Sequence, residues 1–174
     1  MASLKEIKLK AKVSDFSSVK AKLKSLAKFT KNVEYIDYFF KSDNGVNVSE
    51  LRLRNKEETR TIMVKLLIER NQVQVNNEYS FSVDKPEDCV NFLEALGFHA
   101  HISMQKLSEV YFAGDIRIEL ARIKDLGSYV ELTVHFTGDD IKEKVEIVES
   151  FAAKLGLKKE QMDSRYYPQI KEEG

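Results

Sequence analysis

Strict alternation of apolar and charged residues marks the stretch EIKLKAKV at residues 6–13. Successive side chains of a β-strand point to opposite faces, so this pattern predicts a strand with one aliphatic and one charged face. Glu6, Lys8 and Lys10 share the charged face, and Ile7 and Leu9 share the other. Such a row of ionic groups either lies in water or faces something that needs charge.

One helix and three strands are predicted to complete the first half of the chain. A cap at Ser14 or Asp15 precedes apolar residues at helical spacing, which predicts a helix. Alternation then predicts strands at 33–40, 48–55 and 59–69, with the hairpin turn NKEE between the last two.

The second half repeats this order. A strand at 78–83 runs into a helix that Asp84 caps and that ends at Gly97. Further strands are predicted at 108–113, 116–123 and 128–136, followed by a helix at 139–157 and a short helix in the tail. We therefore expect one domain over 1–174, with pseudo-equivalent halves at 1–77 and 78–174.

About eight antiparallel strands with amphipathic helices predict an α+β fold. A set of this length is expected to close into a barrel, because open edges promote aggregation. Helices on the outside would cover the aliphatic strand faces and leave the charged faces toward the lumen. Besides residues 6, 8 and 10, alternation places on those charged faces Glu50, Arg52, Arg54, Lys65, Glu78, Arg117, Glu119 and Glu131. A charged lumen is costly to keep dry and would suit a multiply charged ligand. The alternative is an open sheet with one solvated face.

Composition narrows the class of protein. The 174 residues carry zero net charge, which argues against nucleic-acid binding over a broad basic surface. No apolar run is long enough to span a membrane, and the N-terminus lacks the apolar core of a signal peptide, so a cytoplasmic location is expected. The single Cys89 excludes an intrachain disulfide. His99 and His101 form an HxH pair that is more typical of a surface than of a metal site.

Several motifs, in order, resemble the CYTH superfamily over nearly the whole chain. The motifs are EIKLK for the ExExK signature, YIDYFF with Asp37, ELRLR, TIMVK ending at Lys65, the segment 76–98, KLSEVY with Lys106, the hairpin IRIELARIKDLGSYVELT with Glu131, and RYYPQI. The superfamily comprises class IV (also called class 2) adenylyl cyclases, thiamine triphosphatases and inorganic triphosphatases.

The resemblance implies an eight-stranded tunnel in which bases bind a triphosphate and acids hold Mg²⁺ or Mn²⁺. Together with the inner-face pattern, it suggests triphosphate contacts by Lys8, Lys10, Arg52, Arg54, Lys65, Lys106 and Arg117. The expected metal ligands are Glu6, Glu78, Glu119 and Glu131, and the expected catalytic residues are Glu6, Lys10 and Lys65. The expected ligand is a nucleoside triphosphate, thiamine triphosphate or inorganic tripolyphosphate, with no nucleic-acid or membrane partner.

Departures from the family pattern fall mainly on acidic positions, which makes the metal doubtful. Where the family has acids, this chain has Lys8, Ser80, Ser82, Ala121 and Thr133. An ammonium at Lys8 can lie where a metal would, and Glu119 is a candidate displaced ligand. Three functions therefore stay open. They are metal-dependent cyclisation or hydrolysis of a triphosphate, a catalytically degenerate polyphosphate- or nucleotide-binding module, and a structural or interaction protein with a wet tunnel and no ligand.

Overall fold

The computed structural model describes residues 4–174, which form eight strands and four α-helices. The strands are β1 (Leu4–Val13), β2 (Lys28–Ser42), β3 (Glu50–Lys56), β4 (Thr59–Arg70), β5 (Gln74–Ser82), β6 (Phe98–Ala113), β7 (Ile116–Ile123) and β8 (Gly127–Phe136). The helices are α1 (Ser17–Leu26), α2 (Pro86–Ala95), α3 (Ile141–Leu155) and α4 (Tyr167–Glu173), with a 3-10 turn at Lys159–Gln161.

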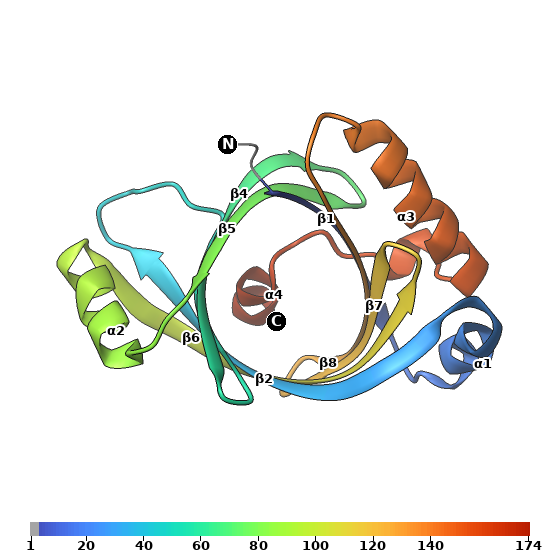
Figure 1. The fold of residues 1–174 in the computed structure, drawn as a ribbon, viewed down its shortest axis with the longest axis horizontal. Coiled ribbons are helices and arrows are strands. Elements are labelled where there is room, and N and C mark those ends of the chain that lie inside the picture. Colours follow the sequence, from blue (N-terminus) through green and yellow to red (C-terminus); the bar gives the residue numbers. More distant parts are fainter. Residues whose placement is uncertain (1–3) are drawn as a thin grey trace.

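The strands close into an antiparallel barrel in the order β1-β5-β4-β3-β2-β6-β7-β8 (Figure 1). The predicted α+β barrel is therefore confirmed. A strand, a helix and three strands follow one another twice along the chain. The first strands of the two sets pair with each other, as do the second strands, β2 with β6.

Three strands begin earlier than the alternation predicts. β2 begins at Lys28 instead of 33, β5 at Gln74 instead of 78, and β6 at Phe98 instead of 108. Residues 28–32 at the start of β2 are all exposed and carry no apolar pattern. The start of β6 does alternate, with Phe98, Ile102 and Met104 on one face and polar residues on the other, so this part was within reach of the pattern and was missed. Phe16 and Lys85 directly precede α1 and α2, but Asp15 accepts a hydrogen bond of 2.6 Å from the backbone N–H of Ser17, the first residue of α1. The predicted cap at Asp84 is wrong, because Lys85 holds that position.

Helices cover the outside of the barrel on two sides (Figure 1). α1 and α3 pack on β1, β7 and β8 through Ile7, Leu9, Leu23, Val148 and Leu132. On the opposite side, α2 packs over β2, β3 and β6 through Leu93. At the start of β4, Ile62 packs in the same cluster as Leu93 of α2. Further along this face the side chains are exposed: Leu66 of β4 by 37%, and Tyr79 and Phe81 of β5 by 49% and 69%. The expectation that helices cover every aliphatic strand face is wrong at this point.

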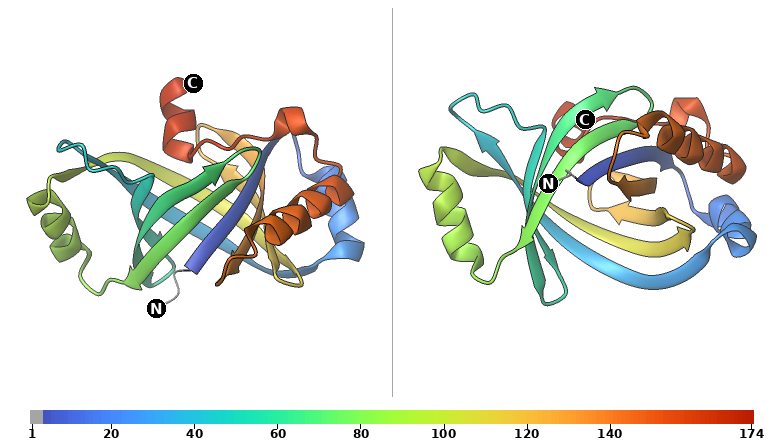
Figure 2. Two further views of the ribbon diagram at one scale, coloured as in Figure 1. Left: turned by 90° about the horizontal axis from the view of Figure 1, so that it is seen from above. Right: turned by 45° about the horizontal axis from the view of Figure 1, so that its top comes forward.

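One end of the barrel is closed by the C-terminal segment (Figure 2). α4 lies across this end and buries Tyr167 and Ile170 against an apolar lining of the lumen. That lining consists of Phe39, Met104, Ala121, Ile123 and Tyr129. Tyr166 and Tyr167 are both buried in this closure. Within residues 4–174, every helix is too short or too polar to cross a membrane.

Candidate functional site

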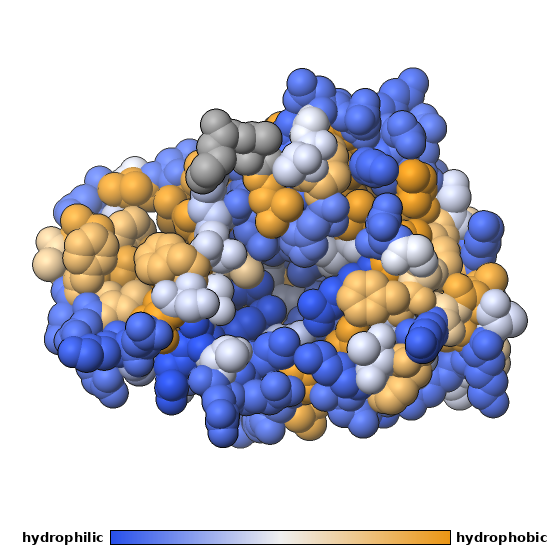
Figure 3. All heavy atoms as spheres, in the orientation of Figure 1, coloured by the Kyte–Doolittle hydropathy of each residue, from blue (hydrophilic) through white to orange (hydrophobic). Residues whose placement is uncertain are grey.

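The charged face of each strand points into the barrel, as the alternation predicts. In β1, Ile7 and Leu9 belong to the outer core, while Glu6 and Lys10 are buried on the opposite face. All of the predicted site residues lie on this inner face, and within the described chain all except Lys10 form an ion pair with a charged side chain of the same or a nearby strand. Viewed from the end opposite α4, the molecule has a central hollow lined by hydrophilic residues (Figure 3).

Two lysines occupy the centre of this lumen among acidic side chains. Lys106 Nζ lies 3.0 Å from Glu131 and 3.1 Å from Glu119, which are neighbours on β8 and β7. Lys8 Nζ lies 3.3 Å from Glu131 and 3.7 Å from Glu6. Burial would raise the pKa of Glu131, but Lys106 and Lys8 hold it well below its usual range. The lysines thus already neutralise the carboxylates expected to hold a metal here.

A second cluster links β2 and β3. Arg54 donates two hydrogen bonds to Asp37, of 2.7 and 2.6 Å, because the two residues face each other in the strand register. Arg52 lies 3.3 Å from Glu50 and 3.7 Å from Asp37. Burial opposes ionisation of Asp37, but Arg54 and Arg52 prevail and lower its pKa to about 2.

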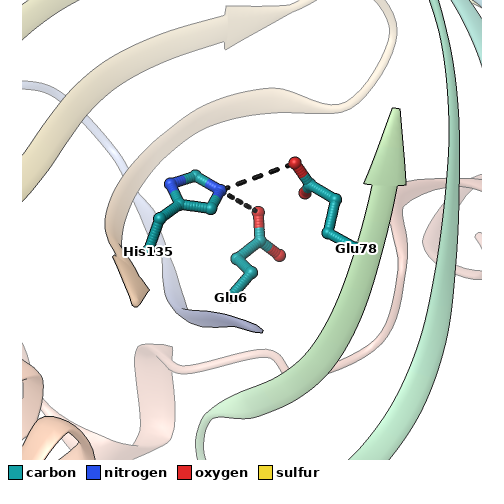
Figure 4. Close-up of side chains that lie close together, drawn as sticks. All are labelled: Glu6, Glu78 and His135. Carbon is teal, nitrogen blue, oxygen red and sulfur yellow. Dashed lines mark ion pairs between the residues drawn. The ribbon is translucent and has the colours of Figure 1, made fainter. Parts of the chain in front are cut away.

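The open end of the lumen holds an acidic cluster on three neighbouring strands. Lys65 donates hydrogen bonds of 2.7 and 2.9 Å to Glu6. Burial would raise the pKa of Glu6, but Lys65 and Lys8 hold it well below its usual range. Glu6, Glu78 and His135 offer ligand atoms that all lie within 4.8 Å of one another (Figure 4).

Lys10 differs from the other lumen bases. Among the described residues it is the one lumen base without a carboxylate inside ion-pair distance. Its ammonium donates to the backbone oxygen of Arg165 and lies 4.4 Å from the ring centroid of Tyr167. Burial lowers the pKa of Lys10 to about 8, because Glu131 and Asp163 compensate only in part.

Two arginines keep an unused donor. The Nε atoms of Arg52 and Arg117 are buried and have no hydrogen-bond partner within residues 4–174. The buried hydroxyl of Ser108 also has no hydrogen-bond partner within these residues. Arg117 otherwise donates to Tyr35 at 2.6 Å and pairs with Glu119 at 2.9 Å. Buried donors without an acceptor are costly, so the lumen offers binding capacity to an incoming acceptor.

Sequence reasoning did not place three participants in the site: His135 was missed altogether, and Asp37 and Tyr167 entered only through the motifs YIDYFF and RYYPQI. His135 follows Glu131 and Thr133 at a spacing of two, so the alternation that found Glu131 also places His135 on the inner face. Asp37 shares a face with Val33, Tyr35 and Phe39, and this mixed face gave no signal. Tyr167 donates to Glu131 at 2.7 Å, a contact that only the folded tail creates.

The HxH pair lies outside the lumen. His99 pairs with Asp43 at 3.1 Å, and His101 contacts Glu172. Both histidines are partly exposed on β6, and each has a single carboxylate neighbour, so this pair forms no metal cluster among the described residues.

Comparisons with known proteins agree with the barrel fold. The CYTH domain model matches residues 4–167. No curated protein matches the chain in sequence. A solved structure from Pyrococcus horikoshii OT3 superposes with a TM-score of 0.81 at 27% identity, over 93% of this chain and 96% of that one.

Two further solved structures are named as candidate cyclases, one of them with a stated activity. A candidate adenylate cyclase from Vibrio parahaemolyticus has a TM-score of 0.80 at 18% identity, and the match covers 99% of each chain. A candidate adenylyl cyclase from Hippeastrum, with a dominant triphosphatase activity, has a TM-score of 0.63 at 16% identity over 88% of each chain. At these identities the likeness concerns the fold.

Proposed function

This chain belongs to the CYTH family, and we propose that its tunnel binds the triphosphate group of a small molecule and hydrolyses the terminal phosphate. The unused donors of Arg52 and Arg117 carry this proposal. Both arginines lie on the inner face of a lumen that is rich in bases, and guanidinium groups bind phosphate oxygens through paired donors. The ligand is a nucleoside triphosphate, thiamine triphosphate or inorganic tripolyphosphate.

The charge of the lumen supports an anionic ligand. Its bases are Lys8, Lys10, Arg52, Arg54, Lys65, Lys106 and Arg117, and its acids are Glu6, Asp37, Glu50, Glu78, Glu119 and Glu131. Bases exceed acids by one, and Lys10 has no carboxylate partner. Phosphate oxygens of a bound triphosphate would replace the internal acids as partners of these bases. Lys10, Arg52 and Arg117 would be its first contacts.

Hydrolysis is the reaction that these residues support best, because it requires recognition of phosphates alone. Cyclisation also requires that a ribose 3′-oxygen be held against the α-phosphate. In hydrolysis the oxygen of water forms a bond to the terminal phosphorus while the bond to the bridging oxygen breaks, and the proton of water passes to solvent. Lys10 and Lys65 would stabilise the charge that develops on the leaving oxygens.

Glu6 would orient the attacking water. While Lys65 holds it, its low pKa makes it a weak base, so orientation is its main role. When Lys65 moves to a phosphate oxygen, Glu6 loses that neighbour and becomes more basic. The same exchange would therefore bind the substrate and prepare the carboxylate.

The Mg²⁺ or Mn²⁺ implied by the family does not fit the centre of the lumen. Such an ion needs carboxylate oxygens that are free to coordinate it. Here Lys106 bridges Glu119 and Glu131, and Lys8 lies between Glu131 and Glu6. The positions that would add oxygen ligands are Ala121 and Thr133, and Ala121 belongs to the apolar lining.

This misfit supports a second candidate function, a triphosphate-binding module without turnover. The two functions share the binding step and differ in product formation. Release of phosphate from tripolyphosphate, ATP and thiamine triphosphate, measured with and without Mn²⁺, separates them. Binding without release of phosphate would favour the module.

Calorimetric titration of the chain with inorganic tripolyphosphate, in the presence of a chelator, tests the binding step. We expect a dissociation constant on the order of micromolar. Arg52→Met should weaken binding at least tenfold, which corresponds to about 1.4 kcal/mol. Lys24→Met, on the exposed face of α1, is the matched control and should bind like the parent chain. Absence of binding in the parent chain would refute the proposal.

A further inference from the structure

Three side chains from adjacent strands converge at the open end of the tunnel. Glu6 lies on β1, which pairs with β5 on one side and with β8 on the other. Glu78 and His135 come from those two neighbours, and His135 is the direct cross-strand partner of Glu6. Figure 4 shows the imidazole and the two carboxylates pointing toward one another.

The spacing of these groups is too long for hydrogen bonds and close to that of ligands around a metal. His135 Nε2 lies 3.6 Å from Glu78 Oε1 and 3.7 Å from Glu6 Oε2. A direct N–H···O bond is shorter, at about 2.7–3.2 Å. An ion about 2.1 Å from two ligands at a tetrahedral angle holds them about 3.4 Å apart. Small rotations of the side chains would bring all three ligands into range.

The site also contains a carboxylate oxygen that accepts no hydrogen bond from residues 4–174, and it can be reached from the mouth of the tunnel. Glu78 is 93% buried, and its Oε2 atom accepts no hydrogen bond within the described chain. The imidazole of His135 is 38% exposed, whereas the Glu6 side chain is 3% exposed. His135 therefore lies where an ion entering from the mouth would arrive, and the buried carboxylates lie behind it.

We propose that Glu6, Glu78 and His135 form a binding site for a divalent transition-metal ion at the mouth of the tunnel. An imidazole nitrogen suits Zn²⁺, Co²⁺, Fe²⁺ and Mn²⁺ better than Mg²⁺, which prefers oxygen ligands. This position lies apart from Glu119 and Glu131, which Lys106 bridges, but it shares Glu6 with Lys8, whose ammonium lies 3.7 Å from Glu6 Oε2. Three protein ligands leave further coordination positions open to water or to a phosphate oxygen.

Lys65 is the opposing charge at this site. Its ammonium lies 2.7 Å from Glu6 Oε1 and 3.7 Å from Glu78 Oε2. Glu6 Oε2 faces His135, but Lys65 also donates to this oxygen at 2.9 Å. An ion must therefore share Glu6 with Lys65 or displace it, so we expect binding of moderate strength by the metal alone. This metal site does not depend on the proposed triphosphate function.

Titration of the untagged chain with Co²⁺ alone, at a pH of about 8, tests the site through its visible absorption bands. We expect one saturable Co²⁺ site that Zn²⁺ displaces and Mg²⁺ at the same concentration does not. His135→Ala should weaken Co²⁺ binding at least tenfold, and Glu78→Gln should do the same. His101→Ala, which removes a partly exposed histidine on the outside, is the matched control and should leave the titration unchanged.

Two results would overturn the proposal: Co²⁺ binding that His135→Ala leaves intact, or no saturable binding in the parent chain. Circular dichroism of each variant in the absence of metal controls for loss of fold. Metal-free titration with tripolyphosphate keeps the two proposals apart. Saturable Co²⁺ binding without tripolyphosphate binding would support this site and refute the proposed function, and the reverse result would do the opposite.

Discussion

Lys10 is a deeply buried base that has no ion-pair partner among the described residues. Its neighbours at the closed end are the Tyr167 ring and a backbone carbonyl, which stabilise an ammonium less than a carboxylate does. Burial therefore lowers its pKa to about 8, with partial compensation by Glu131 and Asp163. A phosphate oxygen is the partner that this side chain lacks.

The affinity for tripolyphosphate should fall as the pH rises through about 8. Above this value the free protein loses the Lys10 charge, and binding must take up a proton, so affinity should drop by up to about tenfold per pH unit. Lys10→Met should bind more weakly at pH 7 and lose this step. Calorimetry between pH 6.5 and 9.5 measures it, with Lys24→Met as control. A parent chain without the step would contradict this role of Lys10.

Asp37 should contribute to stability through its pair with Arg54. Its pKa of about 2 lies below the unfolded value, so the contribution is present above about pH 4 and is lost as the pH falls toward 2. Asp37→Asn should lower the free energy of unfolding at pH 7 by about 2–3 kcal/mol. Urea denaturation at pH 7 and pH 3 measures the effect, and the difference should shrink at pH 3. A constant difference would indicate a steric cause.

Alternation predicted the inner-face position of most site residues, because one face of β1, β3, β7 and β8 is aliphatic. It gave no signal for Asp37, whose face also carries Val33 and Phe39. Its pairing with Arg54 depends on the register of β2 and β3, which strand periodicity does not determine. Alternation could have placed His135 on the inner face. It could not have predicted that His135 lies close to Glu78, because this depends on β1 lying between β5 and β8.

At the scale of elements, the closure of the tunnel depends on a tail that has little periodicity of its own. α4 has seven residues, too few for a stable isolated helix, so tertiary contacts must hold it. Tyr167 supplies two of these contacts. Its ring meets the Tyr129 ring edge-on, with the ring centroids 5.3 Å apart, and its hydroxyl donates a hydrogen bond to Glu131. The family has acids where this chain has Ala121, and Ala121 belongs to the apolar surface that α4 covers.

Tyr167→Phe should destabilise the protein by about 1.5 kcal/mol, because Glu131 loses a buried donor while the ring packing remains. Tyr167→Ala should cost about 3–5 kcal/mol, because it also removes the ring. Chemical denaturation measures both effects. Tyr38→Phe, on the partly exposed outer face of β2, is the matched control and should change stability by less than about 0.5 kcal/mol. Equal stability of Tyr167→Phe and the parent chain would show that the hydroxyl contact is unimportant.

At the scale of the molecule, the lumen is a nearly neutral set of opposing charges. A closed barrel forces the inner faces of eight strands together, so within the described residues every lumen base except Lys10 finds an acid at a distance that the sequence alone does not specify. This arrangement stabilises the empty tunnel and also competes with a ligand, because a triphosphate must separate bases from their acids. Removal of one acid should therefore strengthen anion binding, provided that the fold tolerates the change.

Glu119 is the acid that tests this competition best. It pairs with both Lys106 and Arg117, and Glu119→Gln keeps its size while it removes one negative charge from the lumen. Burial disfavours the ionised form of Glu119, whereas Lys106 and Arg117 favour it. Because these effects partly cancel, the Glu119→Gln variant should lose only a modest amount of stability. We expect metal-free tripolyphosphate to bind several-fold more tightly, since about 1 kcal/mol corresponds to fivefold.

Glu149→Gln on the exposed face of α3 removes the same charge outside the tunnel, and it should change affinity little because solvent screens it. Calorimetry of the three proteins at two salt concentrations measures the effect. Weaker binding by Glu119→Gln would mean that Glu119 positions the bases for the ligand, and the competition between internal acids and the triphosphate would then have the opposite sign.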